Sequence, residues 1–338
     1  GAVDTMLKTL KAAWGRNHRI VGNFFALSVV QFANYLAPLI LIPYLTRVLG
    51  LSRYGLVELA RAVSVYFLLL TDYGFSYSAT REVSIHRDDP DRLSEIFSAV
   101  ILLKLLLTFL GAAILSVIVF AVPRLRSDWP VYYLAFGSVV GMCLFPLWLF
   151  QGLERMKHIA VLNVAAKLLV IVTTILFVRQ PDDYLYVPLL HSAGALVIGL
   201  AGLVLVLRSF HLRFRLPGVD VLKREFLNGW HLFVSKIATS LCTTSNVVVL
   251  GLFVDNVFVA YYGPGEKIVW AAADGLVNPL SQAIFPHVSR LASQSKQAAL
   301  RLAGRVAVLV SVLTLMVSAA LFIMAPYVAR LALGQDWQ

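Results

Sequence analysis

The chain has 338 residues, of which 59% are hydrophobic and only 14% are charged, and its mean hydropathy is +0.79. A soluble domain carries about 25% charged residues, so this composition excludes a soluble globular protein and indicates a membrane protein. The net charge of +11 comes mostly from Lys and Arg residues in loops on one side of the membrane, so nucleic acid is not the expected partner.

Nine apolar segments are long enough to cross a bilayer as helices, because about twenty apolar residues span its hydrocarbon core. They cover residues 20–46, 55–78, 95–122, 130–152, 158–178, 184–207, 227–251, 256–285 and 299–325. The expected fold class is therefore an all-α polytopic membrane protein. The two cysteines, Cys143 and Cys242, lie in different segments and indicate neither a disulfide nor a metal site.

The loops between these segments differ in their content of Lys and Arg. Eighteen such residues fall on the side of the N-terminus, and six fall on the other side, at Arg47, Arg53, Arg124, Arg126, Arg179 and Arg330. Cytoplasmic loops of membrane proteins are enriched in Lys and Arg. We therefore expect a cytoplasmic N-terminus, with a lipid bilayer as the surroundings.

Residues 208–225 form the longest connection and divide the chain. In its first half, apolar residues alternate with Arg213 and Arg215, and Pro217 and Gly218 follow. Two interpretations stay open: a basic amphipathic linker on anionic headgroups, or an ordinary basic cytoplasmic loop. In both cases, the connection divides the chain into residues 1–207, with six expected spans, and residues 226–338, with three.

Five cations interrupt the apolar segments, and they are Arg61, Lys104, Lys167, Lys236 and Lys267. Lys167 lies about ten residues into its segment, which corresponds to a depth of roughly 15 Å. A cation at this depth costs about 2.5–3.5 kcal/mol unless it faces water or a charged partner. We expect these residues to face a wet cavity that holds an anion, although Arg61, Lys104 and Lys236 could instead extend to the headgroups.

Polar residues accompany these cations at helical spacing. Asn34, Asn163 and Asn246 lie on such polar faces and complete the candidate substrate-binding set. The alternative is that these faces only form hydrogen bonds between helices. Asp72, Glu266 and Asp274 are candidates for coupling to a proton or sodium gradient, or for structural ion pairs with the cations.

Proline and glycine are expected to interrupt several spans. They are Pro38, Pro43, Pro146, Pro188, the Gly263-Pro264-Gly265 sequence, Pro279 and Pro286. Bending at the first and eighth spans is the expected hinge. The chain lacks a GxxxxGK[ST] phosphate loop, an HExxH sequence and Cys/His ligand spacing. We therefore expect no enzyme activity, no metal and no cofactor.

Several short segments have distinctive sequences: residues 37–50 (APLILIPYLTRVLG), 72–84 (DYGFSYSATREVS), 148–154 (WLFQGLE), 266–268 (EKI) and 279–286 (PLSQAIFP). They resemble segments of bacterial lipid-linked O-antigen flippases. These flippases belong to the multidrug/oligosaccharidyl-lipid/polysaccharide exporter superfamily. The resemblance implies a fold of twelve helices in two six-helix lobes around a central cavity. Since the chain ends at Gln338, just after the ninth span, the resemblance implies that it is a C-terminally truncated fragment.

The resemblance also implies a bacterial inner membrane and a substrate, an oligosaccharide on undecaprenyl pyrophosphate. This substrate moves from the cytoplasmic to the periplasmic leaflet by alternating access. It implies polysaccharide polymerase and chain-length machinery as partners. Two other classes stay open: an ion-coupled drug or cation antiporter of the same superfamily, and a non-transporting subunit of a polysaccharide assembly complex. An antiporter is expected to have mainly acidic residues in its cavity, whereas five cations dominate here.

Overall fold

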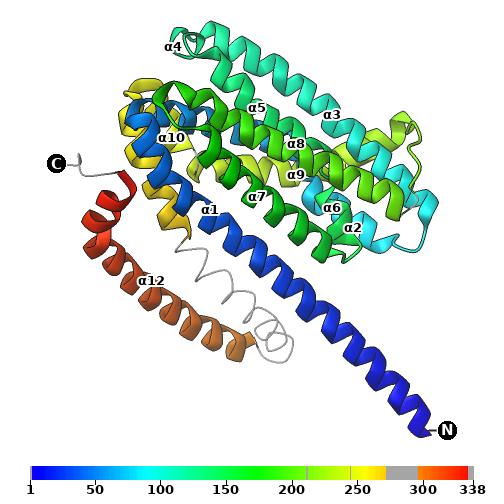
Figure 1. The fold of residues 1–338 in the computed structure, drawn as a ribbon. Coiled ribbons are helices and arrows are strands. Elements are labelled where there is room, and N and C mark those ends of the chain that lie inside the picture. Colours follow the sequence, from blue (N-terminus) through cyan, green and yellow to red (C-terminus); the bar gives the residue numbers. More distant parts are fainter. Residues whose placement is uncertain (1, 211, 244, 272–295, 334–338) are drawn as a thin grey trace.

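The computed structural model describes residues 2–210, 212–243, 245–271 and 296–333 (Figure 1). Within these residues the chain forms α-helices and one 3-10 helix, without a strand. Five of the described helical segments are long and apolar enough to cross a membrane, or six if the bent pair Val219–Leu241 and Ser245–Phe253 is one span. The expectation of an all-α polytopic membrane protein is confirmed.

Helix α1 (Ala2–Asp72) contains the first two expected spans as two helical arms. They meet at Gly50, whose φ of 74° and ψ of 163° lie in a region that favours glycine. Both Pro38 and Pro43 lie inside the first arm without ending it, so the expected interruption there is wrong. In this arm, the Tyr44 hydroxyl donates to the carbonyl of Val178 at 2.7 Å, which fastens the arm to the chain after α7.

The second expected span, residues 55–78, is broken at Tyr73 and Gly74, where α1 ends and α2 (Phe75–Ile85) begins. Both residues have a positive φ, 45° for Tyr73 and 83° for Gly74. The Tyr73 ring stacks against Phe226 and Phe233, with ring centroids 4.4 and 4.6 Å apart. These contacts with a later helix hold the break in place.

The next helices form the main bundle, and Figure 1 shows α3, α5, α8 and α7 side by side. Their bounds are α3 (Pro90–Ala121), α4 (Pro123–Arg126), α5 (Trp129–Leu144), α6 (Leu147–Gly152), α7 (Met156–Phe177), η1 (Pro181–Leu185) and α8 (Tyr186–Ser209). The expected interruption at Pro146 is confirmed, because α5 ends before it and α6 begins after it. Pro188 lies in the first turn of α8 and does not interrupt that helix.

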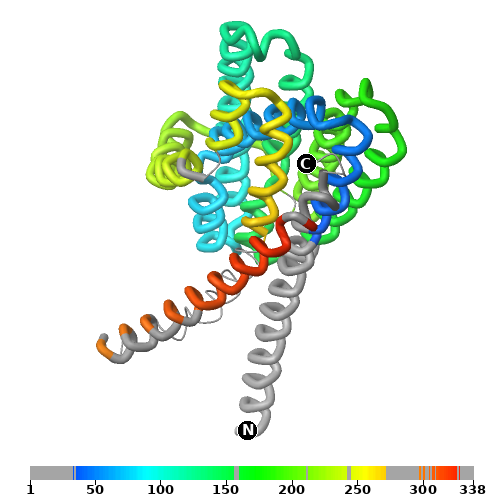
Figure 2. The backbone as a smooth tube through the Cα atoms, turned by 90° about the vertical axis from the view of Figure 1, so that its left-hand side faces the viewer, coloured from blue at the N-terminus to red at the C-terminus, as the bar shows by residue number. Residues whose placement is uncertain are grey.

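After the connection at 208–218, the chain forms α9 (Val219–Thr243), α10 (Ser245–Phe253), a helix over residues 256–271, and α12 (Lys296–Leu333). The Gly263-Pro264-Gly265 sequence is helical, so the predicted interruption at this point is wrong. Pro279 and Pro286 lie outside the described residues. Figure 2 shows α12 at the edge of the molecule, where it contacts α1.

Large apolar side chains are divided between an interior and an outer surface. Trp148, Tyr132 and Phe97 are buried in the cores of the bundle. On α3, by contrast, Phe109 is 81% exposed and Val117 is 69% exposed. A bilayer would cover such faces, which agrees with a multi-pass membrane protein.

Candidate functional site

Two carboxylates on the second arm of α1 bind several of the cations that the sequence analysis identified as candidates. Glu58 and Asp72 are fourteen positions apart, which corresponds to about 21 Å along the helix and almost four full turns. They therefore lie on nearly the same face at two heights. Each binds a lysine from a helix that follows residue 218.

Glu58 accepts hydrogen bonds from three side chains. Its Oε1 atom accepts from the Lys267 ammonium at 2.7 Å and from the Tyr54 hydroxyl at 3.0 Å. Its Oε2 atom accepts from Nε of Arg61 at 3.0 Å. One carboxylate thus contacts two cations, and the group of Glu58, Arg61 and Lys267 carries an excess positive charge.

Helical spacing and one glycine explain this arrangement. Tyr54 and Arg61 lie one turn before and one turn after Glu58, so their side chains reach the same carboxylate. A Cβ atom at Gly263 would lie 3.6 Å from Oε2 of Glu58, so this position brings the helix over residues 256–271 close to α1. Lys267 follows one turn later and reaches the carboxylate.

The cations of this cluster remain partly accessible. The side chain of Arg61 is 48% exposed and that of Lys267 is 22% exposed, whereas Glu58 is 6% exposed. His191 of α8 lies within electrostatic range of Arg61, Lys267 and Lys167. The cations Arg61 and Lys267 and the imidazole of His191, from three helical segments, therefore lie near one buried carboxylate.

Asp72 forms the second cluster. Its Oδ2 atom lies 2.5 Å from Nζ of Lys236, and its Oδ1 atom accepts a hydrogen bond from the Ser76 hydroxyl. The same ammonium lies 4.8 Å from the centre of the Tyr77 ring, which adds a cation–π contact. Lys104 lies within electrostatic range of both Asp72 and Lys236, so a second cation accompanies this carboxylate as well.

Lys104 is 5% exposed, and its ammonium donates a hydrogen bond to the carbonyl of Met142 at 3.3 Å. Met142 belongs to α5, so the amine is enclosed between helices. In this structure it therefore extends neither into lipid nor into solvent.

The structure places the remaining candidate residues separately. Lys167 and Asn163 are half-buried on α7, and Glu266 is half-buried beside Lys267. Asn246 is exposed on α10 and donates its amide to the Tyr262 hydroxyl at 2.9 Å. Asn34 lies in α1, but its side chain is outside the described part, and Asp274 lies outside the described residues.

The candidate set does not include two residues that the structure brings to these cations. Glu58 is the central acceptor, and His191 faces Arg61 and Lys267. Glu58 could have been found from its spacing of three positions to Arg61 inside an apolar segment, since such pairs meet on one helix face. No spacing rule links His191 to the cluster.

The chemistry of this site suits an anion with several oxygen atoms. Guanidinium and ammonium groups form short charge-assisted hydrogen bonds to phosphate and carboxylate oxygens. Among the described residues, no group of three or more His, Cys, Asp or Glu side chains could hold a metal ion. The described part therefore offers cationic hydrogen-bond donors rather than a metal centre.

Comparisons with known proteins give a consistent result. A family model described as "Polysaccharide biosynthesis protein" matches residues 20–292. A protein of Escherichia coli (strain K12) named "Putative O-antigen transporter" is 31% identical over 79% of this chain, which spans 64% of that protein. A protein of the same name from Shigella dysenteriae is 29% identical over 93% of this chain and 78% of its own length. No solved structure matches significantly.

Proposed function

The chain belongs to the polysaccharide biosynthesis protein family, and from this premise we propose that it is a flippase for lipid-linked oligosaccharides. Its substrate would be an O-antigen or other surface polysaccharide repeat unit on undecaprenyl pyrophosphate. The protein would move this unit from the cytoplasmic to the periplasmic leaflet of the inner membrane. The names of its relatives and the apolar helices support this proposal.

The distribution of positive charge supports a cytoplasmic N-terminus. The end of the bundle that carries the 85–90 and 152–156 connections is rich in Lys and Arg, and the end with the Gly50 turn is poor in them. Under the positive-inside rule, the first end faces the cytoplasm. Substrate would then enter near the Asp72 cluster and leave near the Glu58 cluster.

The diphosphate would bind to cations of the cluster in place of the Glu58 carboxylate. Arg61 and Lys267 share Glu58, so a phosphate oxygen can take over one of these contacts without leaving a bare cation. Lys167 would supply a further positive charge from α7. The sugar hydroxyls would contact Asn163 and Asn246, while the polyprenyl tail stays in lipid.

Movement between the leaflets would follow from breaking and forming the ion pairs that join α1 to the later helices. Lys236–Asp72 and Lys267–Glu58 are the two such pairs among the described residues, and they lie at different heights on α1. If one pair opens while the other stays closed, the site faces one leaflet at a time. Proton or sodium binding at Asp72 or Glu266 would bias this exchange, as would Asp274.

The observation that carries the proposal is the sharing of Glu58 by two cations, of which Arg61 remains 48% exposed. A fully satisfied structural ion pair would need only one cation for each carboxylate. Glu266 lies within electrostatic range of both cations, but no ion pair between it and either cation is found among the described residues. The exposed guanidinium of Arg61, which shares its carboxylate, therefore supports a site for an anion.

A transport assay tests this function. The chain is reconstituted in liposomes with a fluorescent undecaprenyl-pyrophosphate oligosaccharide, and flipping is followed by quenching of the outer leaflet. Replacing Lys167 and Lys267 together by Ala should abolish flipping while membrane insertion is unchanged. A control double replacement of Lys8 and Lys157, which lie outside the expected spans, should flip at the wild-type rate. Wild-type flipping by the Lys167/Lys267 variant would refute the proposed role of the cations.

A further inference from the structure

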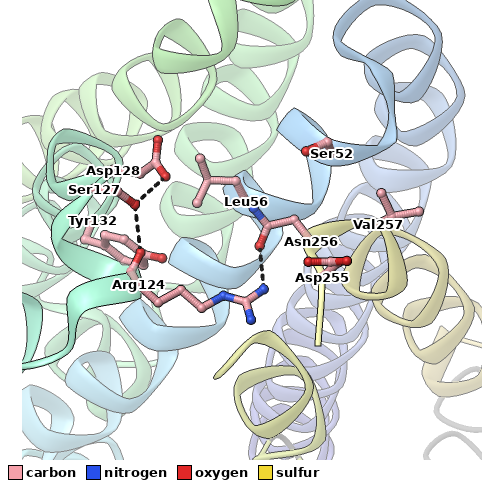
Figure 3. A pocket seen from close by; sticks show the side chains of 9 residues that line it. All are labelled: Ser52, Leu56, Arg124, Ser127, Asp128, Tyr132, Asp255, Asn256 and Val257. Carbon is pink, nitrogen blue, oxygen red and sulfur yellow. Dashed lines mark hydrogen bonds between the residues drawn. The ribbon is translucent and has the colours of Figure 1, made fainter. Parts of the chain in front are cut away.

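A pocket of about 430 Å³ lies at the end of the molecule where α1 turns back (Figure 3). Three segments that are far apart in the sequence form it: Ser52 and Leu56 of α1, the region from Arg124 to Tyr132, and residues 255–257. Its volume falls within the range of about 300–1,000 Å³ that is typical of small-molecule sites. It is separate from the charge clusters of Glu58 and Asp72, whose residues do not line it.

Two carboxylates are among the residues that line the pocket. Figure 3 shows the carboxylates of Asp128 and Asp255 entering from different segments. The hydroxyl groups of Ser52 and Ser127 also line the pocket. Asp128 already accepts a hydrogen bond from the Ser127 hydroxyl at 3.0 Å. Ionised carboxylates only accept hydrogen bonds, so the pair suits a ligand that carries donors.

Arg124 is the one cation among the lining residues, and it already has partners. Its guanidinium donates to the carbonyls of Leu252 and Val254, which close the end of α10. It also lies 3.5 Å from the side-chain oxygen of Asn256. The lining thus carries two carboxylates and one guanidinium that is already hydrogen-bonded. Its net negative charge disfavours the binding of a phosphate group.

Tyr132 supplies an independent sign of a missing partner. It is 1% exposed, lines the pocket, and its hydroxyl has no hydrogen-bond partner in the structure. Buried hydroxyl groups in native proteins are almost always hydrogen-bonded, and an unpaired one calls for an explanation. A polar ligand in the pocket would provide the missing bond.

The pocket lies where α1 approaches a later helix closely. A Cβ atom at Gly55 would lie only 1.7 Å from the carbonyl oxygen of Asn256, so this contact requires glycine. Gly55 is next to Leu56, and Asn256 is between two other lining residues. Relative movement of the helices would therefore change the shape of the pocket.

We propose that this pocket binds a saccharide unit and holds the sugar head of the substrate at the exit side of the membrane. Sugar hydroxyls would donate to Asp128 and Asp255, and the Tyr132 hydroxyl would gain its partner. The inference rests on the proposed function, because it takes the ligand to be the sugar head of the flippase substrate, which would leave Asn163 and Asn246 for this pocket. The pocket lies at the end of the bundle that carries few Lys and Arg residues, where the head group would arrive after translocation.

Saturation-transfer difference NMR on the chain in nanodiscs tests this site. The probes are the methyl glycosides of glucose, galactose, rhamnose and N-acetylglucosamine, with inorganic diphosphate as a competitor. We expect at least one glycoside to bind, and diphosphate not to displace it. Tyr132→Phe removes one neutral hydrogen bond and should weaken binding roughly three- to tenfold. Asp128→Asn combined with Asp255→Asn should abolish the signal.

Two controls separate this inference from the proposed function. Tyr133→Phe removes a neighbouring hydroxyl that bonds to Ser116 at 2.8 Å outside the pocket, so glycoside binding should not change. The Lys167/Lys267 double alanine variant should also bind glycoside normally, although it cannot flip. If no glycoside binds, or if the pocket variants bind like wild type, the saccharide site is wrong even when flipping is normal. If glycosides bind but the wild-type chain does not flip, only the proposed function fails.

Discussion

The ammonium of Lys236 lies 2.5 Å from the carboxylate of Asp72, although 164 positions separate the two residues. Lys267 and Glu58 form a similar contact at 2.7 Å across 209 positions. The helices that follow the 208–218 connection are thus joined to α1 by two charged contacts at different heights. Apolar packing alone does not set their position.

Exchanging the charges of the first pair tests whether it joins these helices as an independent unit. Asp72→Lys places three cations together, because Lys104 and Lys236 are near, and Lys236→Asp places two carboxylates together. Each single variant should lower stability by about 1–3 kcal/mol, because the side chains are only partly buried. The double variant should recover most of this loss, as measured by thermal unfolding in detergent and a double-mutant cycle.

The Glu58–Lys267 pair is left unchanged in all these variants. It is the internal control, because neither exchange should alter its contribution to stability. Flipping in liposomes is followed in the same samples. If the double variant is no more stable than the single ones, Asp72 and Lys236 do not act as a pair.

The close approach between Gly55 and Asn256 gives a second prediction. Gly55→Ala would place a Cβ atom 1.7 Å from a backbone oxygen, so one helix must shift. Such overpacking costs about 1–3 kcal/mol. We expect a lower thermal unfolding temperature. We also expect weaker glycoside binding, since Asn256, which would be displaced, lines the pocket.

Gly265→Ala is the matched control for Gly55→Ala. It lies in a helix interior, and an added Cβ atom would meet nothing within 4 Å. Alanine is favoured over glycine in a helix by about 0.5–1 kcal/mol, so this variant should be equally or more stable. Equal stability of the two variants would show that Gly55 and Asn256 are not in close contact.

Apolar segments predicted the spans well where lipid surrounds the helix. The expected segments 95–122 and 184–207 correspond to α3 (Pro90–Ala121) and α8 (Tyr186–Ser209). Length and hydropathy suffice there, because the hydrocarbon core fixes both. Pro146 was also predictive, since its missing N–H group cannot continue the hydrogen-bond pattern.

The sequence did not predict features that depend on tertiary contacts. Gly50 lies in the expected connection between the first two spans, but nothing local distinguishes Gly74, which adopts a positive φ, from Gly265, which lies within a helix. The break at Tyr73 depends on stacking with Phe226 and Phe233, more than 150 positions away. Likewise, helical spacing placed Arg61 and Asp72 on related faces, but only the fold pairs Asp72 with Lys236 instead.

The connection before α9 gives a third prediction. Its backbone amides of Arg213 and Arg215 donate to the hydroxyls of Ser94 and Ser98 on α3, at 3.2 and 3.0 Å. Replacing both serines by Ala removes these acceptors, and each bond contributes about 0.5–1.5 kcal/mol. Trypsin should then cleave after Arg213 and Arg215 roughly ten times faster than in the wild type.

Ser116→Ala is the control, because it also removes a hydroxyl from α3. This hydroxyl contacts Tyr133 and not the connection. Its cleavage rate should equal that of the wild type. Unchanged cleavage in the Ser94/Ser98 variant would mean that other contacts, such as the ion pair of Arg215 with Asp91 at 2.9 Å, hold the connection.

Lys167 gives the fourth prediction, which separates charge from shape. Among the described residues, no hydrogen bond or ion pair is found for its ammonium, which lies on α7 near His191. Lys167→Gln should therefore leave the thermal unfolding temperature within about one degree while slowing flipping at least about tenfold, since it removes one charge-assisted contact. Lys167→Arg keeps the charge and should retain most activity.

Inorganic diphosphate should inhibit the wild type and Lys167→Arg more strongly than Lys167→Gln, because added anion competes for the same cation. Equal inhibition of all three proteins, with equal flipping rates, would place the diphosphate away from α7 and leave Arg61 and Lys267 as its only candidate ligands in the Glu58 cluster.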